Sequence, residues 1–263
     1  MKVHVYSIDG NAMEEIELPR QFDEEVREEV IRRAVLSEQS RKYQPKGAFI
    51  RAGLQTTAEY RGRKEGYGSI KNRGISRLPR EKFPRGRFGK VKRVPFAVKG
   101  RRAHPPRVEE VLVERINKKE LEKALRSAIA ATAKKEIVSA RGHIVSGVKE
   151  IPLVVETKFE EFEKTKSVLA CLRALGLDAE LGRAQRKKRI SGVRERRRGG
   201  TKRPKSLLIV VGNGSKVARA ARNLAGVDVK GVGELDVNSL APGTHAGRLT
   251  LWSKRAIEEL AKM

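Results

Sequence analysis

The order of apolar and polar residues divides most of the chain into short strands and helices. Residues 2–8 alternate as a half-buried strand does, and Asp9-Gly10 predicts a tight turn into a second short strand over 15–18. Asp23 stands where it can cap a following helix. The apolar residues of that helix recur at helical spacing, at Val26, Val30, Ile31 and Val35.

A second helix is predicted after Asn117, which is a favourable capping residue. Glu120 follows three residues later, at the spacing of a capping box. The helix is rich in alanine, and its apolar face carries Leu121, Leu125, Ala128, Ile129 and Thr132.

The second half of the chain continues with alternating elements. A strand is predicted over 152–156, and a helix over 165–175 ends at Gly176, the residue type that most often follows a helix. The run SLLIVVG at 206–212 is apolar almost throughout. It predicts an interior parallel strand that is covered on both faces.

The C-terminal part keeps the same order. A helix is expected over 215–224, short strands near 227–229 and 248–252, and a last helix from its cap Ser253 to Met263. Such alternation favours an α/β fold, with a mostly parallel sheet and helices on both faces.

Charge is distributed very unevenly along the chain. The 59 Lys and Arg exceed the 32 Asp and Glu by 27. Residues 41–107 hold 21 basic and 3 acidic residues, and residues 183–205 hold 12 and 1, whereas the remainder is close to neutral. We therefore expect one globular domain over 1–40 and 108–263, an inserted arm over 41–107 and a second basic segment over 183–205. Excess charge of this size attracts polyanions, which means nucleic acid or an acidic membrane surface.

The arm has the composition of an extended binding segment. It contains 9 of the 24 glycines and 6 of the 10 prolines, so no long helix or central strand is expected there. Seven of the 12 aromatic residues also lie in it, and basic residues interleaved with aromatics suit phosphate contacts and base stacking. The alternative is an arm that never orders, but disordered segments are usually poor in aromatics. For the 183–205 segment, a nuclear-localisation signal is the alternative.

Residues for catalysis, cofactors or metals are not found in a convincing arrangement. The four histidines show no metal-ligand spacing, and the glycine turn at 212–214 lacks the full pattern of a dinucleotide or phosphate loop, so a simple strand-to-helix connection is expected. Cys171, the one cysteine, lies in an apolar run and predicts a core thiol in a reducing compartment. No secretory signal or run of about 18 apolar residues is present. We expect an intracellular binding protein that is not an enzyme, with no cofactor and no metal.

Four long strings of the chain resemble a known family. They are GYGSIKNRGISRLPRE at 66–81, KGRRAHPPRVEE at 99–110, NKKELEKALRSAIAATA at 117–133 and ELDVNSLAPGTHAGRLTLWSKRAIEEL at 234–260. In this order they resemble the large-subunit ribosomal protein four family of the archaeal and eukaryotic type. The chain lacks the long C-terminal extension of the eukaryotic members, which favours an archaeal protein.

The resemblance implies a structural constituent of the large ribosomal subunit, located in the cytoplasm. Members of the family have a globular α/β domain on the outer side of the subunit and bind several domains of the large-subunit rRNA early in assembly. Their long loop lines the narrow part of the polypeptide exit tunnel. Residues 41–107 would be this loop, with 60–74 near its tip. The partners implied are rRNA, neighbouring large-subunit proteins and the nascent polypeptide, with no membrane.

Our hypothesis is that the arm folds only against RNA. Its expected rRNA contacts are Arg61, Arg63, Lys64, Lys71, Arg73, Arg77, Arg80, Lys82, Arg85, Arg87, Lys90, Lys92, Arg93, Arg101 and Arg102. The expected base-stacking residues are Tyr60, Tyr67, Phe83 and Phe88. The second basic segment would bind with Arg186, Lys187, Lys188, Arg189, Arg194, Arg196, Arg197 and Arg198. The rival interpretations are a nucleic-acid processing enzyme and a DNA-compacting or membrane-associated basic protein.

Overall fold

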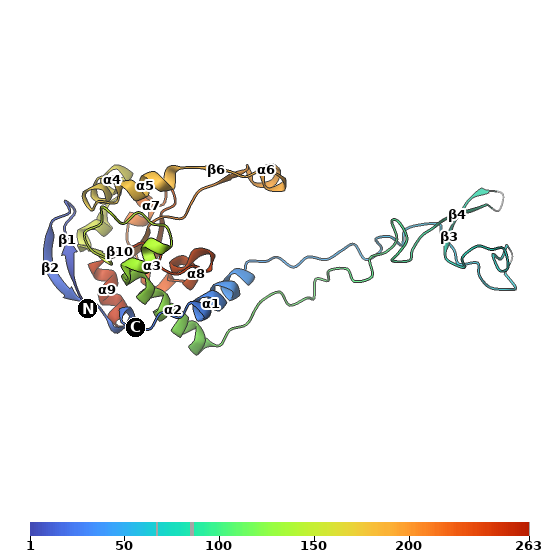
Figure 1. Ribbon diagram of the computed structural model, residues 1–263, viewed down its shortest axis with the longest axis horizontal. Helices are drawn as coiled ribbons and strands as arrows, with labels where there is room; N and C mark the ends of the chain where they lie inside the picture. Colours follow the sequence, from blue (N-terminus) through green and yellow to red (C-terminus); the bar gives the residue numbers. More distant parts are fainter. Residues whose placement is uncertain (67, 85–86, 263) are drawn as a thin grey trace. The chain divides into compact units, whose positions relative to one another are not determined.

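The computed structural model describes residues 1–66, 68–84 and 87–262, with the side chain of Arg198 left out. The predictions for Tyr67, Arg85 and Met263 lie outside the described residues. The chain divides into two compact units (Figure 1). We call Met1–Lys42 together with Val113–Met263 the sheet unit, and Tyr43–Leu112 the arm unit; each is described by itself.

The sheet unit is built on six strands in the order β2-β1-β5-β10-β8-β9. All neighbours pair in parallel except β2, which pairs antiparallel with β1 at one edge. The strands are β1 Lys2–Tyr6, β2 Ala12–Glu17, β5 Leu153–Val155, β8 Leu208–Val211, β9 Asp228–Gly231 and β10 Thr250–Ser253. The predicted interior position of β8 is confirmed, because β10 and β9 flank it and all four of its residues are buried.

Helices connect and cover these strands (Figure 1). They are α1 Glu28–Ser40, α2 Lys118–Ala133, α3 Lys135–Ala140, α4 Thr165–Ala174, α5 Asp178–Gln185, α7 Val217–Ala221, α8 Val237–Leu240 and α9 Lys254–Ala261. Short 3-10 turns occur at Arg20–Phe22, Thr157–Glu161, Val232–Glu234 and Pro242–Thr244. The sequence patterns did not predict α3, α5 or α8, and α7 is shorter than expected.

Successive side chains of the sheet enter two different cores. Leu208 and Val210 of β8 pack with α1, α2, α8 and α9, whereas Ile209 and Val211 pack with α4, α5 and α7. Because neighbouring residues of a strand point to opposite faces, the two clusters lie on opposite sides of the sheet. The expected α/β fold with helices on both faces is therefore confirmed.

Two predicted helix ends are confirmed by their geometry. The Ser253 hydroxyl accepts a hydrogen bond from the Ala256 N–H at 3.0 Å and caps α9. Gly176 follows α4 with φ +79°, and a Cβ there would lie 2.0 Å from the carbonyl oxygen of Gly147. Only glycine fits this close, left-handed position.

Two predicted caps are wrong in detail. Asp23 ends the 3-10 turn Arg20–Phe22, and α1 begins only at Glu28; the N–H of Arg27 before it donates to Ser127 Oγ of α2 at 2.7 Å. Asn117 does precede α2, but its side chain makes no capping bond, and Glu120 pairs instead with Arg33 of α1 at 2.9 Å. Contacts between α1 and α2 thus replace the local caps.

Candidate nucleic-acid interface

The arm unit is organised by a short antiparallel hairpin. Its strands are β3 Arg80–Lys82 and β4 Phe88–Val91, and Glu59 extends the pairing by exchanging backbone hydrogen bonds with Arg80 at 3.0 and 3.1 Å. Ala58 and Ile70 are buried beside it, and the Arg93 guanidinium donates to the carbonyl of Ala58 at 3.2 Å. The arm unit therefore has local order without a long helix among its described residues.

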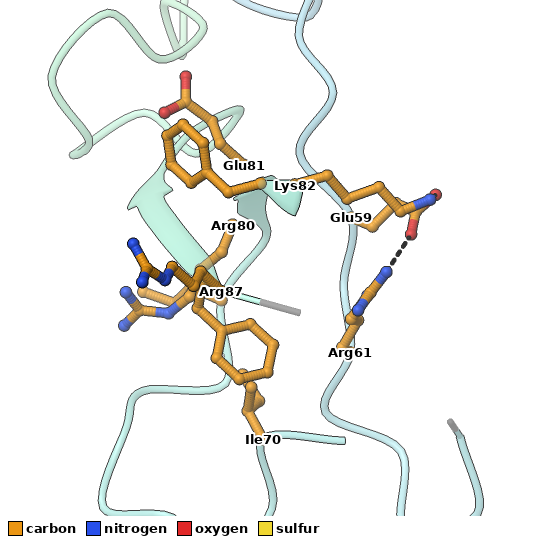
Figure 2. Close-up of a pocket in the computed structure, with 10 residues that line it drawn as sticks. Glu59, Arg61, Ile70, Arg80, Glu81, Lys82 and Arg87 are labelled. Carbon is orange, nitrogen blue, oxygen red and sulfur yellow. Dashed lines mark hydrogen bonds and ion pairs between the residues drawn. The ribbon is translucent and has the colours of Figure 1, made fainter. Parts of the chain in front are cut away.

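Glu59 gathers two of the predicted RNA-binding cations. Lys82 Nζ donates to Glu59 Oε1 at 2.7 Å, and an Arg61 guanidinium nitrogen lies 3.5 Å from Glu59 Oε2 (Figure 2). The hydrogen bond from Lys82 is the main cause of a lowered pKa of the Glu59 carboxyl, although its side chain is exposed. The bond from Lys82 links β3 to the segment that contains Glu59 and Arg61.

A cavity of about 230 Å³ lies beside this pair. Arg80 and Arg87 line it together with two of the predicted stacking residues, Phe83 and Phe88 (Figure 2). The Arg80 guanidinium donates to Ser76 Oγ at 2.7 Å, and its buried Nε has no partner among the described residues. The arrangement places aromatic rings next to cations, as a site for an unpaired base and its phosphate requires.

The predicted contacts of the arm divide into two groups. Six contact protein groups in the arm: Arg61, Arg73, Arg80, Lys82, Lys92 and Arg93. Eight have no side-chain hydrogen bond or ion pair with any residue that the structure describes: Arg63, Lys64, Lys71, Arg77, Arg87, Lys90, Arg101 and Arg102. The second group carries positive charge that the protein does not compensate.

The aromatic rings predicted to stack on bases differ in how exposed they are. Tyr60 and Phe83 are exposed, at 55% and 52%. Phe88 is half-buried, and the Arg73 guanidinium lies 5.8 Å from its ring centre, at cation–π distance. Tyr60 and Phe83 can therefore receive a base as they stand, whereas Phe88 already has Arg73 over it.

The second basic segment forms a projecting hairpin of the sheet unit (Figure 1). Its strands are β6 Lys188–Arg189 and β7 Thr201–Lys202, and the short helix α6 Val193–Arg198 lies between them. Gly192 and Gly199 adopt φ of 81° and 69° at the two ends of α6. Positive φ at both positions suits glycine and allows the chain to reverse within a few residues.

Like charges face one another in this hairpin. Lys188 is the direct cross-strand partner of Lys202, an arrangement that destabilises a two-stranded pair. The side chains of seven predicted contacts are exposed and make no hydrogen bond or ion pair within the described structure: Arg186, Lys187, Lys188, Arg189, Arg194, Arg196 and Arg197. An anionic partner would relieve this repulsion.

A third basic region was predicted only in part, because Arg183 and Arg203 lie in the expected 183–205 segment whereas Arg141, His143 and His245 were not expected beside them. Arg141, His143, Arg183, Arg203 and His245 line one cavity of about 710 Å³ in the sheet unit. They come from the loop after α3, from α5, from the segment after β7 and from the loop before β10. Residues so far apart in the chain carry no common sequence signal, which is why only the fold reveals the cluster.

An ionised carboxylate lies buried at the back of this region. Glu180 Oε1 accepts from Arg183 at 2.6 Å and contacts His143 Nδ1 at 2.7 Å, and its Oε2 accepts from the Ile144 N–H at 3.0 Å. Burial raises the pKa of Glu180, but these hydrogen bonds more than offset it and lower the pKa to about 2. The carboxylate is thus fully charged at neutral pH and holds His143 and Arg183 in place.

The glycine turn after β8 is occupied by the protein itself. The Gly212 N–H donates to Glu160 Oε1 at 2.7 Å, and Glu160 also accepts from the Ser253 hydroxyl. A carboxylate already holds the N–H that a bound phosphate would use in such a loop. The turn therefore connects β8 to α7, as the incomplete sequence pattern predicted.

The cysteine, possible metal ligands and possible membrane-spanning helices were also considered among the described residues. The Cys171 thiol is buried, and burial raises its pKa to about 12, so it is a core residue and not a nucleophile. Within residues 1–66, 68–84 and 87–262, no cluster of three metal-ligating side chains occurs. In the same part of the chain, no helix combines the length and apolar character needed to cross a membrane.

The fold and these surfaces define a basic α/β protein that presents uncompensated cations on two extended segments. The sequence profile of the Ribosomal protein L4/L1 family matches residues 16–263. Proteins named "Large ribosomal subunit protein uL4" are 49% identical in Methanococcus maripaludis and 44% identical in Methanocaldococcus jannaschii, each over 99% of this chain and 98% of the relative. A third, from Methanospirillum hungatei, is 46% identical over the same shares.

The chain belongs to the ribosomal protein L4/L1 family. It is a structural constituent of the large subunit of the cytoplasmic ribosome and not an enzyme. The expected resemblance to the archaeal type is confirmed by these archaeal relatives.

Proposed function

We propose that this protein is a primary rRNA-binding protein that contacts several domains of the large-subunit rRNA with its arm unit and its second basic hairpin. The observation that carries the proposal is the excess of cations without protein partners among the described residues: seven exposed cations and the half-buried Lys71 in the arm unit, and seven exposed cations in the hairpin. Phosphates are the natural counter-charge for such surfaces within a ribosomal subunit.

The two surfaces suit different modes of contact. The arm unit combines arginines with exposed aromatic rings, so it binds phosphates and stacks on unpaired bases. The hairpin offers cations and no aromatic side chain between 183 and 205, so it binds the backbone alone. One protein that joins two such segments bridges separate RNA regions, which suits a role early in subunit assembly.

The tip of the arm, residues 60–74, lines the polypeptide exit tunnel in this proposal and contacts the nascent chain. Its support is the extended, glycine-rich character of the arm and the family resemblance of residues 66–81. Neighbouring large-subunit proteins are the remaining partners. Crosslinking from a photoreactive residue placed at Lys64 tests the tunnel contact: a stalled nascent chain is the expected product, and a crosslink to rRNA alone would contradict it.

Salt dependence tests the electrostatic part of the proposal. If about ten phosphates are neutralised, log affinity falls with log salt at a slope between roughly −7 and −9. The triple variant R194Q/R196Q/R197Q should reduce the slope by about 2 to 3. The matched control K119Q/K123Q/R126Q removes three exposed cations from α2 and should leave the slope unchanged. A slope near zero for the unmodified protein would overturn the proposal.

Hydrogen exchange tests whether RNA orders the arm. We expect amides of 43–112 to exchange rapidly in the free protein and to become protected in the large subunit. Strong protection in the free protein would contradict folding upon binding, although RNA binding itself would stand. Sedimentation after a high-salt wash provides the cellular counterpart: retention on the large subunit is expected, and release would indicate a peripheral protein.

A further inference from the structure

The cavity lined by Arg141, His143 and Arg203 lies where the second basic hairpin joins the sheet. Lys202 belongs to β7, and Arg203 and Lys205 follow it directly on the way to β8. The same cavity is closed from another side by the 242–246 loop. A strand of RNA bound along the hairpin would therefore meet this cavity without leaving the sheet unit.

Arg141 is a cation without a carboxylate partner among the described residues. Its guanidinium donates to the carbonyl of Pro242 at 2.6 Å and, at 3.4 Å, to that of Ala246. Burial, and then repulsion from Arg248 and Arg183, lowers the pKa of Arg141 to about 10. Arginine still remains charged at neutral pH, so the cavity contains a partly desolvated positive charge that only carbonyl dipoles stabilise.

His143 provides a second unsatisfied group. Its side chain is 1% exposed, and its Nδ1 donates to the ionised Glu180 at 2.7 Å. The other ring nitrogen, Nε2, is buried and has no partner among the described residues. Buried polar atoms of this kind are rare, because each one left without a hydrogen bond destabilises the fold.

The nearby carboxylates do not compensate this charge. Glu180 is already bonded by Arg183 and His143, and Asp228 is bonded by Lys205 at 2.8 Å and by Arg248 at 2.7 Å. Glu28 is the remaining carboxylate in the cavity lining. Three cations of the lining, Arg141, Lys202 and Arg203, have no carboxylate partner in the described part of the chain, so the cavity is electropositive.

The backbone around the cavity is also unusual. Thr244 adopts φ +73°, a left-handed conformation that is a marked outlier for a β-branched residue. Such strain persists only where the surrounding structure holds it, and it is frequent at ligand sites. A strained loop therefore forms one wall of the cavity.

We propose that this cavity binds a phosphate group of the RNA backbone, with Arg141 as its central ligand and Lys202 and Arg203 at its mouth. The proposal rests on the RNA-binding function above and adds a third contact, on the sheet unit. Phosphate suits the cavity because its oxygens accept hydrogen bonds from guanidinium and ammonium groups. The continuity with the hairpin through Lys202 favours RNA as the source of the phosphate over free inorganic phosphate.

The test compares R141Q with R126Q in the full chain, using large-subunit rRNA as the probe. Arg126 is an exposed arginine of α2 outside the cavity. We expect R141Q to weaken binding about tenfold and R126Q to leave it unchanged, since about 1.4 kcal/mol per specific phosphate contact corresponds to tenfold. In phosphate-ethylation interference on the rRNA, the signal at one phosphate position should be present with the unmodified protein and absent with R141Q. R141K should restore part of the affinity but not all of it, because lysine cannot bind bidentately.

Folding and ligand source are checked separately. R141Q should leave the unfolding temperature nearly unchanged, because removal of a partly desolvated charge offsets the loss of the hydrogen bonds to Pro242 and Ala246. If the unfolding temperature of R141Q falls instead, the rRNA affinity of R203Q is used to test the inference. Arg203 is exposed, so its substitution leaves no buried gap. If R203Q, R141Q and the unmodified protein bind rRNA with equal affinity, the inference is wrong. The proposed function would still stand in that case if the affinity of the unmodified protein falls steeply with salt. The inference also fails if inorganic phosphate stabilises the unmodified protein but not R141Q while rRNA affinity is equal.

Discussion

The substitution E180Q tests the buried network behind the cavity. Glu180 is 1% exposed, and hydrogen bonds from Arg183, His143 and Ile144 hold its pKa at about 2 instead of the ordinary 4.5. One pKa unit corresponds to about 1.4 kcal/mol, so ionised Glu180 stabilises the fold by about 3 kcal/mol at pH 7. Because the folded-state pKa is depressed, this contribution is complete above pH 4.5 and is lost as the pH falls towards 2.

Glutamine cannot replace this carboxylate. It has nearly the same shape, but its NH₂ group must face a donor from Arg183, His143 or Ile144, and its charge is absent. We expect E180Q to lower the free energy of unfolding by about 3 kcal/mol at pH 7. The difference should shrink to about 1.4 kcal/mol at pH 3, where the native carboxylate has lost most of its advantage.

Urea unfolding between pH 7 and pH 3 measures both values. Trp252 is the only tryptophan and is fully buried in β10, so its fluorescence reports on the sheet unit. E163Q is the matched control, because Glu163 is exposed and pairs with Lys216 at 2.9 Å; its stability should be unchanged. A loss with E180Q that stayed constant across this pH range would refute the electrostatic reasoning, and no loss at all would refute the network itself.

Two further predictions concern the core around α4. G176A should lower the free energy of unfolding by more than about 1 kcal/mol, because φ is +79° and the new Cβ would meet the Gly147 carbonyl; the urea midpoint measures this, and an unchanged midpoint would contradict the geometry. The Cys171 thiol should react with a thiol reagent only after unfolding, given its burial and a pKa of about 12; rapid reaction of the native protein would show that it is accessible.

The fold was largely predictable because its signals are local. The uninterrupted apolar run of β8 reflects burial on both faces of a sheet, and Gly176 and Ser253 mark helix ends through backbone geometry within a few residues. Asp23 failed as a cap because α1 is fixed by a bond between Arg27 and Ser127, which are 100 residues apart. Such contacts leave no periodic pattern in the sequence.

The sequence predicted where the basic segments lie, but not which of their cations contact other protein groups. Composition located the two basic segments, since 33 cations with 4 acidic residues cannot compensate one another. It could not show that Arg80 and Lys82 hold the arm unit together whereas Arg77 and Lys90 have no partner among the described residues. It also gave no sign of the role of Glu180, because the His143 that contacts this carboxylate lies 37 positions away.

The arm leaves and re-enters the sheet unit at a clamped pair of chain segments. Ser37 Oγ donates to the carbonyl of Glu114 at 2.6 Å, and Ser40 Oγ accepts from the Glu114 N–H at 3.0 Å. The arm is therefore a closed ring of about 70 residues whose ends are joined before any RNA is present. Joining the ends of a flexible loop of this length costs about 4 kcal/mol of entropy. This entropy is lost when the sheet unit folds, so in the proposed RNA complex the two chain segments of the ring would contact the RNA together, as one bivalent ligand.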